Sequence, residues 1–507
     1  MRKTSRNCFI SLFICVLLVL TVFSCGTTEE AAEEVVEEEF VPVVPAAEPE
    51  SEKPLASEPA AETAPVEEPA SVEEPVVPPE PVFTEEKFVK SLQNALSSGS
   101  IDDALALFDD IPEENEESFD LNYLQASLLV SNGNYNEAGE IADKLLAAEP
   151  ANTDVLLLQS VIAKATGNAA EKKKILNQIL AADPNNSDAN TELGNEYMLK
   201  KSWKLARDKY DKAFKSDPYN MEALAGYGKA SYYLGNLKDA EDAFKLVLVL
   251  HPDNAFSWAY LAKIYSEQER NFEAADCALK AVQAEPAYFD YWLDYGEYLG
   301  KLEKYSEAEK AFTSAINLRS EYFLGYVYRG GIYDRQEKFE LAKEDYQMVA
   351  ELRPEYYYIY ESLGFLEWHD QNWTEAREWF QKAATASPSD TSYPMLIALC
   401  MYHEGNNRGA KDYVYKTVLK KFPNTSTEYA VMRLFYDNVA DGTVATKVQN
   451  ESNVNTRGKM LFYLAQYYQL KGRDNLAQKY YIAVKEMEAP MFIESRLNDW
   501  ALEQMMN

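Results

Sequence analysis

The chain has few of the residues that carry most enzyme and metal chemistry. Only three histidines and five cysteines occur in 507 residues, and two of the cysteines, Cys8 and Cys15, lie in an apolar run near the N-terminus. A disulfide scaffold is therefore excluded. No phosphate-binding glycine loop, dinucleotide fingerprint or nucleophile elbow is present, and His403-Glu404 runs into Gly405, unlike a zinc helix. We expect no catalytic residue, metal site, cofactor or small-molecule substrate, and hence no enzyme.

Basic residues are scarce as well. Lysine and arginine total 49 against 83 aspartates and glutamates, which gives a formal net charge of -34. Such a chain repels a phosphate backbone, so nucleic-acid binding is excluded. Only one apolar run approaches membrane-spanning length, which excludes a polytopic membrane protein.

The first 24 residues have the layout of a secretory signal. The basic segment MRKTSRN precedes the apolar stretch 8–23, and the tetrapeptide VFSC ends at Cys25. This tetrapeptide resembles the lipobox of bacterial lipoproteins, although Phe23 departs from the usual small or aliphatic residue. The resemblance implies cleavage after residue 24 and acylation of Cys25, which would hold the protein on a membrane without a spanning helix. A plain cleaved signal and an uncleaved anchor helix remain alternatives.

The segment after Cys25 has the composition of an unfolded tether. Residues 26–84 contain 11 of the 22 prolines and 17 glutamates against the single Lys53. Such a segment cannot bury enough apolar surface to offset its ordering entropy, and its like charges stretch it. We expect residues 25–84 to form a disordered acidic linker between the lipid and the folded body.

From residue 85 the sequence repeats every 34 residues. Prolines occur at 150, 184, 218, 252, 286, 354 and 388, and the corresponding 34-residue windows begin at 119 and every 34 residues to 357. Position 8 of each window is Ala, Ser or Gly, position 20 is alanine except at Lys172, and position 24 is often aromatic. Small residues at 8 and 20 allow two antiparallel helices to approach closely, and proline ends the second helix.

This set of positions resembles the tetratricopeptide repeat. The resemblance implies an all-α fold, a right-handed superhelix of helix pairs forming an α-solenoid. The expected segments are a degenerate N-terminal repeat (85–118), eight in-register repeats (119–390), a divergent repeat (391–424), a degenerate helix plus loop (425–457), a last repeat (458–490) and a C-terminal capping helix (491–507).

In this family, positions 2, 5, 9, 12 and 13 of each first helix line a concave groove that commonly binds a partner's peptide. Aromatic anchors with a few charges suit such recognition, although an aromatic stripe at helical spacing also suits a core. Gly226 and Gly228 are interpreted only as repeat packing. The predicted groove residues are Tyr123, Lys229, Tyr232, Tyr233, Phe256, Tyr260, Lys263, Tyr328, Arg335, Phe365 and Trp368.

Together these features predict a non-catalytic interaction scaffold on a bacterial cell envelope. The acyl chains at Cys25 would place it on the periplasmic face of the outer membrane in preference to the inner membrane or the cell surface. Its partners would be other envelope proteins, for example in cell-wall or outer-membrane biogenesis. The alternative is a surface-exposed structural or adhesin-type lipoprotein that acts through its convex face or by self-association.

Overall fold

The computed structural model describes residues 83–97, 99–437, 439–487 and 491–506, and all regular secondary structure in these ranges is helical. The predicted signal segment, Cys25 and nearly all of the acidic linker lie outside the described residues. No described helix is both long and apolar enough to cross a bilayer.

The chain divides into two compact units, with the boundary between Ile264 and Tyr265 inside helix α12. We call the described residues up to Ile264 unit 1 and those from Tyr265 onward unit 2. The helices that begin in unit 1 are α2 (Glu85–Ser97), α3 (Ile101–Ala106), η1 (Leu107–Asp110), η2 (Glu113–Asn115), α4 (Phe119–Ser131), α5 (Tyr135–Ala148), α6 (Thr153–Ala165), α7 (Ala169–Ala182), α8 (Ser187–Leu199), α9 (Trp203–Ser216), α10 (Met221–Tyr233), α11 (Leu237–Leu250) and α12 (Ala255–Glu267).

Unit 2 continues the helix pairs and ends in a less regular group. Its helices are α13 (Asn271–Ala284), α14 (Phe289–Lys301), α15 (Tyr305–Leu318), α16 (Leu324–Arg335), α17 (Phe339–Leu352), α18 (Tyr358–His369), α19 (Trp373–Ala386), α20 (Ser392–His403), α21 (Asn407–Tyr413), η3 (Val414–Val418), η4 (Leu419–Lys421), α22 (Thr427–Asp437), α23 (Asp441–Gln449), α24 (Val454–Leu470), α25 (Asp474–Lys485) and α26 (Glu494–Met506).

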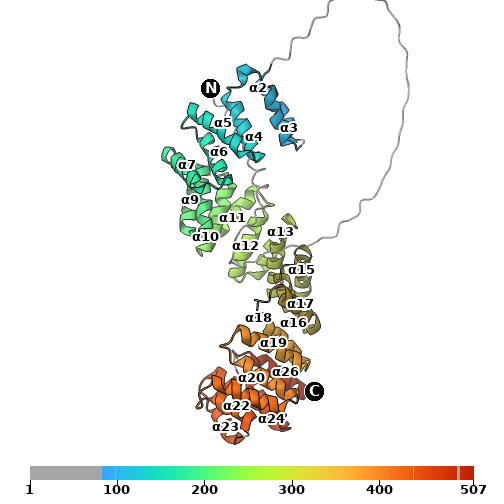
Figure 1. Cartoon of the computed structure of the whole chain (residues 1–507). Helices are drawn as coiled ribbons and strands as arrows, with labels where there is room; N and C mark the ends of the chain where they lie inside the picture. The colour runs from blue at the N-terminus through green and yellow to red at the C-terminus, as the bar shows by residue number, and fades with distance from the viewer. Residues whose placement is uncertain (1–82, 98, 438, 488–490, 507) are drawn as a thin grey trace, which may run out of the picture. The chain divides into compact units, whose positions relative to one another are not determined.

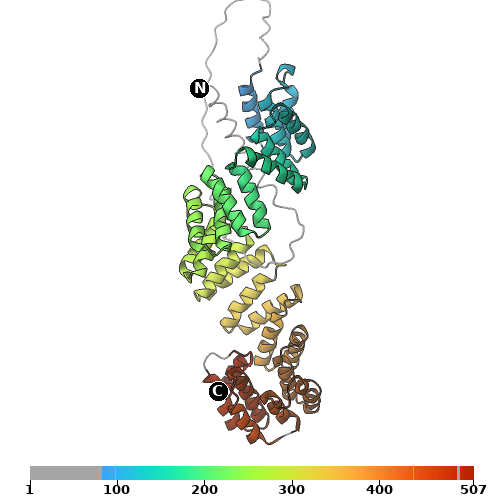
Figure 2. The same ribbon diagram turned by 90° about the vertical axis from the view of Figure 1, so that its left-hand side faces the viewer.

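The 34-residue period of the sequence is also the period of the helices. The helices α4, α6, α8, α10, α12 and α14 begin at the predicted window starts 119 to 289, and α16 and α18 begin one residue after theirs. Within each unit such a helix packs against the helix that follows it, as the labelled pairs α4 and α5, or α10 and α11, illustrate in Figure 1. Figure 2 shows the green helices of unit 1 paired in the same way from a second direction. The all-helical repeat fold predicted from the sequence is confirmed.

The small residue at position 8 of a repeat faces the aromatic ring at position 24. A Cβ atom added to Gly194 would lie 2.6 Å from a ring carbon of Tyr210, and one added to Gly364 would lie 2.5 Å from a ring carbon of Phe380. Both rings are buried. The two helices of a pair therefore touch through the backbone of one and the ring of the other.

The C-terminal part of unit 2 contains a short extra helix between its repeats. A loop or irregular helix was expected after the degenerate helix near residue 435, and residues 441–449 form the short helix α23, followed by α24 from Val454. Val444, Ala445 and Val448 are buried and give this segment an apolar helical face. The last helix pair, α24 and α25, is followed by α26 at the expected position of the capping helix.

Candidate functional site

A hollow of about 540 Å³ lies in unit 1 and is lined by residues of five helices, α6, α8, α9, α10 and the start of α12. Nine of its twelve lining residues occupy positions 2, 5, 9, 12 or 13 of their repeats, which are the predicted groove positions. The other three are Trp203, Tyr210 and Gly226. The nine are Lys164, Asn195, Met198, Leu199, Glu222, Ala225, Lys229, Tyr233 and Phe256.

Gly226 at position 6 of its repeat lines the hollow and leaves room for the ring of Tyr210 at its wall. The neighbouring repeats carry the larger Glu192 and Tyr260 at the same position. A Cβ atom on Gly226 would lie 2.5 Å from the Cζ atom of Tyr210, so the ring occupies the space that a side chain would need. The interpretation of Gly226 as repeat packing alone was therefore incomplete, since this glycine also lines the hollow.

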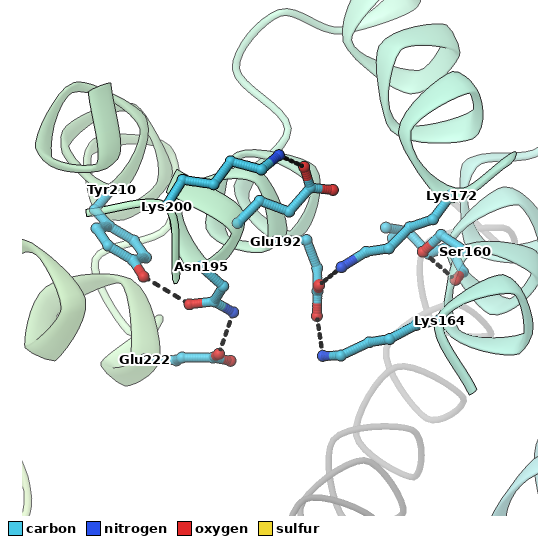
Figure 3. Close-up of polar contacts among 10 residues, drawn as sticks. Ser160, Lys164, Lys172, Glu192, Asn195, Lys200, Tyr210 and Glu222 are labelled. Carbon is cyan, nitrogen blue, oxygen red and sulfur yellow. Dashed lines mark hydrogen bonds and ion pairs between the residues drawn. The ribbon is translucent and has the colours of Figure 1, made fainter. Parts of the chain in front are cut away.

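A chain of hydrogen bonds crosses the wall of the hollow (Figure 3). The Tyr210 hydroxyl donates to Oδ1 of Asn195 over 2.6 Å, and Nδ2 of Asn195 donates to Oε1 of Glu222 over 2.7 Å. Burial raises the pKa of Tyr210, and the negative charges of Glu222 and Glu192 raise it further. The phenol therefore remains a donor, which fixes the amide of Asn195 with its nitrogen toward Glu222.

The lysines near the hollow already have partners. Glu192 pairs with Lys172 and, over 3.3 Å, with Lys164 (Figure 3). Burial disfavours the Glu192 carboxylate, but these two lysines outweigh it and lower its pKa. The Nζ atom of Lys229 lies 5.6 Å from the ring centre of Phe256, a cation–π distance. Lys172 is the one departure from alanine at position 20, and the structure explains it as the buried partner of Glu192.

Glu222 differs from Glu192 in having a neutral partner. It accepts the amide of Asn195, and none of the ion pairs among the described residues includes it. Further carboxylates lie at position 2 of the two preceding repeats, Asp154 and Asp188. Burial raises the pKa of Asp188, and the charges of Asp217, Asp154 and Glu222 raise it further, so these carboxylates share one negative field.

The apolar part of the hollow combines stacked rings with an exposed rim. The rings of Trp203 and Tyr233 stack with their centres 4.6 Å apart and 18° between their planes. The side chain of Leu199 is 86% exposed at the end of α8. An exposed leucine beside stacked rings and a fixed carboxylate can hold both an apolar and a polar group of a ligand.

Three of the predicted groove residues, Lys229, Tyr233 and Phe256, line the hollow. Tyr232 lies beside it, with its ring centre 5.5 Å from that of Tyr260, and Lys263 is half-buried on α12.

Two predicted groove residues of unit 1 belong to the core instead. Tyr123 is buried in the cluster of α4 and α5, and Tyr260 is buried with its ring stacked 5.1 Å from Phe244. Their large rings fill the space between helices, so the prediction that they are displayed in a groove was wrong.

In unit 2 the predicted groove residues do not form a hollow. Tyr328 is half-buried and stacks on Phe312, with ring centres 5.5 Å apart, whereas Arg335 is exposed on α16. Phe365 and Trp368 are buried, so the prediction of an open groove at these two residues was wrong.

The chain's own C-terminal helices explain the burial of Phe365 and Trp368, which lie in one core cluster with residues of α24, α25 and α26. Arg496 of α26 donates to both carboxylate oxygens of Asp334 at position 12 of its repeat, and the ring of Trp500 lies 4.8 Å from that of His369. The groove positions of the last repeats are thus covered by the protein itself.

Sequence reasoning missed Lys164, Asn195, Met198, Leu199, Glu222 and Ala225, although all six occupy the groove positions. Their positions in the repeat indicated a place in the groove, but the prediction favoured aromatic residues and left them out. Trp203, Tyr210 and Gly226 had no such signal, because they occupy positions 17, 24 and 6, outside the predicted groove positions.

Among the described residues, no cluster of three or more His, Cys, Asp or Glu side chains is arranged to hold a metal ion. His403 is half-buried and its pKa is lowered by desolvation, although its Nε2 atom lies 3.0 Å from Oε1 of Gln466. The Cys400 thiol is buried, and burial raises its pKa. Both side chains belong to the core cluster of unit 2 or pack against it.

Two models of the tetratricopeptide repeat match the chain, one at residues 92–153, 191–255 and 329–391 and the other at residues 129–195. No curated protein sequence matches it.

Solved structures with similar folds include MamA, YrrB and the PilF protein of Pseudomonas aeruginosa. MamA is 22% identical over 32% of this chain and 94% of its own, with a TM-score of 0.30. YrrB, described as a tetratricopeptide-repeat protein with an unusual peptide-binding site, is 19% identical over 35% and 92%, with a TM-score of 0.31. PilF is 19% identical over 41% and 93%, with a TM-score of 0.35. The family-model matches and the 34-residue helix pairs together identify tetratricopeptide repeats in both units of this chain.

Proposed function

We propose that the protein is a non-catalytic scaffold that binds a segment of a partner protein in the hollow of unit 1. The observation that carries this proposal is the coincidence of the hollow with the groove positions of consecutive repeats. Repeat solenoids present such positions on one continuous face, which suits an extended or helical segment.

The composition of the hollow supports a protein segment as the ligand. The stacked rings of Trp203 and Tyr233 and the exposed Leu199 provide apolar anchors, and Asn195 provides an amide held in one orientation. Aromatic anchors surrounded by a few oriented polar groups are typical of sites that bind side chains of a partner.

The membrane part of the proposal rests on the sequence. Acylation of Cys25 and the acidic linker to residue 84 would hold the repeats at a set distance from a bacterial membrane and concentrate them near envelope partners. Metabolic labelling with a fatty-acid analogue tests this step: label on the parent and none on Cys25→Ser supports the anchor, and equal labelling of the two contradicts it.

The binding step is tested by crosslinking in cells followed by mass spectrometry. Leu199→Gln combined with Tyr233→Ala changes the rim of the hollow, and Val249→Gln is the matched control, because Val249 is 74% exposed on α11 and does not line the hollow. We expect the parent and the control to capture the same proteins and the rim variant to lose them. If the control loses the captured proteins, or the rim variant keeps them, binding lies elsewhere. The convex face, which the alternative function would use, is one such place.

A further inference from the structure

We propose that the hollow of unit 1 binds an α-helix of the partner, with an aromatic residue against the rings of Trp203 and Tyr233 and an apolar residue one turn earlier against Met198. This inference rests on the proposed function and adds the conformation and the chemistry of the bound segment. Its basis is a helix of this chain that occupies the equivalent positions of another repeat.

A pair of aromatic rings recurs where one repeat meets the next. One ring comes from position 17, at the start of a second helix, and the other from position 13 of the following repeat, at the end of its first helix. The centres of the two rings lie 4.6, 4.5 and 4.3 Å apart in the three pairs of this kind. In chain order, these pairs are Trp203 with Tyr233, Phe339 with His369, and Trp373 with His403.

The chain's own C-terminal helices cover two of these pairs. The ring of Trp500 in α26 lies 4.8 Å from that of His369 and 5.6 Å from that of Phe339. The Nε2 atom of His403 lies 3.0 Å from a glutamine side chain of α24, and Trp373 packs against the core cluster that contains α24 and α25. A helix is thus the structure that this chain places on such a ring pair.

The third pair, Trp203 with Tyr233, lies in the hollow of unit 1. Both rings line it, and Tyr233 is 38% exposed. The helices α8, α9 and α10 end at residues 199, 216 and 233, each of which is four 34-residue repeats before the end of α16, α17 or α18. Because the repeats of a solenoid share their local geometry, α26 on its ring pair shows how a helix fits the equivalent rings of unit 1.

Two residues of α26 that lie one turn apart make its contacts with this part of the groove. Arg496 and Trp500 are four residues apart and therefore lie on the same face of the helix. Arg496 donates to both carboxylate oxygens of Asp334 at position 12, and its guanidinium lies 4.3 Å from the ring centre of Trp500. The helix thus pairs an aromatic residue with a second residue four positions earlier, which contacts position 12.

The second residue must differ in unit 1, because position 12 differs. Met198 is the equivalent of Asp334, and the exposed Leu199 follows it, so an apolar surface replaces the carboxylate. Both residues lie at the end of α8 and line the hollow together with Trp203 at the start of α9. An arginine at this point would lose the counter-ion that Arg496 has, whereas a leucine or methionine would gain apolar contact.

The test is selection by the full-length protein from two display libraries of 13-residue peptides, which is the length of α26. One library has an alanine-rich helical frame, and the other carries a central proline that breaks a helix. We expect the parent to enrich, from the helical library alone, peptides with an aromatic residue and an apolar residue four positions before it. Replacing the selected aromatic residue with alanine should weaken binding about 10-fold.

A change of charge in the hollow tests the second residue. Met198→Asp gives unit 1 the carboxylate that Asp334 provides in unit 2, and Val249→Asp is the matched control, because Val249 is 74% exposed on α11 and does not line the hollow. We expect Met198→Asp to bind the selected peptides about 10-fold more weakly and to regain affinity when their apolar residue is replaced by arginine. The control should bind as the parent does. The regained affinity would also show that Met198→Asp is folded.

The remaining results separate this inference from the proposed function. Equal enrichment from the proline library, or aromatic and apolar residues without a fixed spacing, overturns the helix and leaves the proposed function standing. Met198→Asp with the same preference as the parent overturns the contact with position 12 and with it the inference. A parent that enriches no peptide overturns the inference too, and crosslinking in cells with the rim variant then decides the proposed function without any peptide.

Discussion

Replacing Gly226 with alanine tests whether the ring of Tyr210 fills the space beside this glycine at the wall of the hollow. The added Cβ atom would lie 2.5, 2.7 and 2.8 Å from three carbons of the Tyr210 ring. That ring is 2% exposed and also lies against Gly194, so it has little room to move. To restore an ordinary contact the ring must shift by roughly 1 Å, in an interior packed as densely as an organic crystal.

Two opposing terms set the expected change in stability. Overpacking of a dense site costs about 1–3 kcal/mol. Alanine in a helix interior gains about 1 kcal/mol over glycine. Gly139 in α5 is the matched control, because an added Cβ atom there meets no atom within 4 Å and only the gain applies. We therefore expect Gly226→Ala to be less stable than Gly139→Ala by about 1–3 kcal/mol.

Hydrogen exchange followed by mass spectrometry measures this difference locally, which suits repeats whose stability depends on their neighbours. Protection should fall in α8, α9 and α10 of Gly226→Ala and should rise in α5 of Gly139→Ala. The second change Tyr210→Leu should remove most of the difference by removing the ring. Equal protection in the two alanine variants would refute the claim that Tyr210 fills the space beside Gly226.

Three further predictions concern buried charge and the C-terminal helices. Lys172→Ala restores the alanine expected at position 20, yet it should lower the free energy of unfolding of unit 1 by about 1–3 kcal/mol, because Glu192 loses a buried partner. Urea unfolding measures this change, and an unchanged free energy of unfolding would contradict a stabilising role of the Lys172–Glu192 ion pair. Asp334→Asn should weaken the interaction with Arg496 by about 1 kcal/mol and speed hydrogen exchange in α26. Unchanged exchange in α26 would show that the Arg496–Asp334 ion pair does not stabilise this helix. Burial lowers the pKa of His403 from its ordinary 6.5, so below about pH 6.5 the unfolded chain binds a proton that the folded chain does not. The melting temperature of the parent should consequently fall with pH in that range, and a fall just as steep in His403→Gln would assign it to other groups.

The helix pairs followed from the sequence because one period fixes several physical requirements together. Small residues at positions 8 and 20, a ring at position 24 and a terminating proline all concern contacts within one repeat, and α8 and α9 satisfy them where expected. The segment of α23 could be predicted only as a loop or irregular helix, because no repeat pattern marks it and its three buried residues become a core face only against neighbouring helices.

The sequence predicted which repeat positions line the candidate site better than it predicted which individual residues do so. The groove positions contain nine of the twelve lining residues, but exposure at those positions depends on distant parts of the chain. Trp368 and Gly226 illustrate the two ways in which this happens. Trp368 is buried in a cluster that includes C-terminal helices far along the chain, and Gly226 leaves the space in which the ring of Tyr210, from the preceding helix, forms part of the wall of the hollow.

The central claim is that partners bind in the hollow of unit 1, and site-specific photo-crosslinking tests it most directly. A photoreactive residue at position 199 places the probe on the rim of the hollow, and one at position 249 places it on an equally accessible apolar site of α11. The account predicts a crosslinked partner from position 199 that is lost on Trp203→Ala, and none from position 249. A partner crosslinked from position 249 alone, or from position 199 without loss on Trp203→Ala, would contradict it.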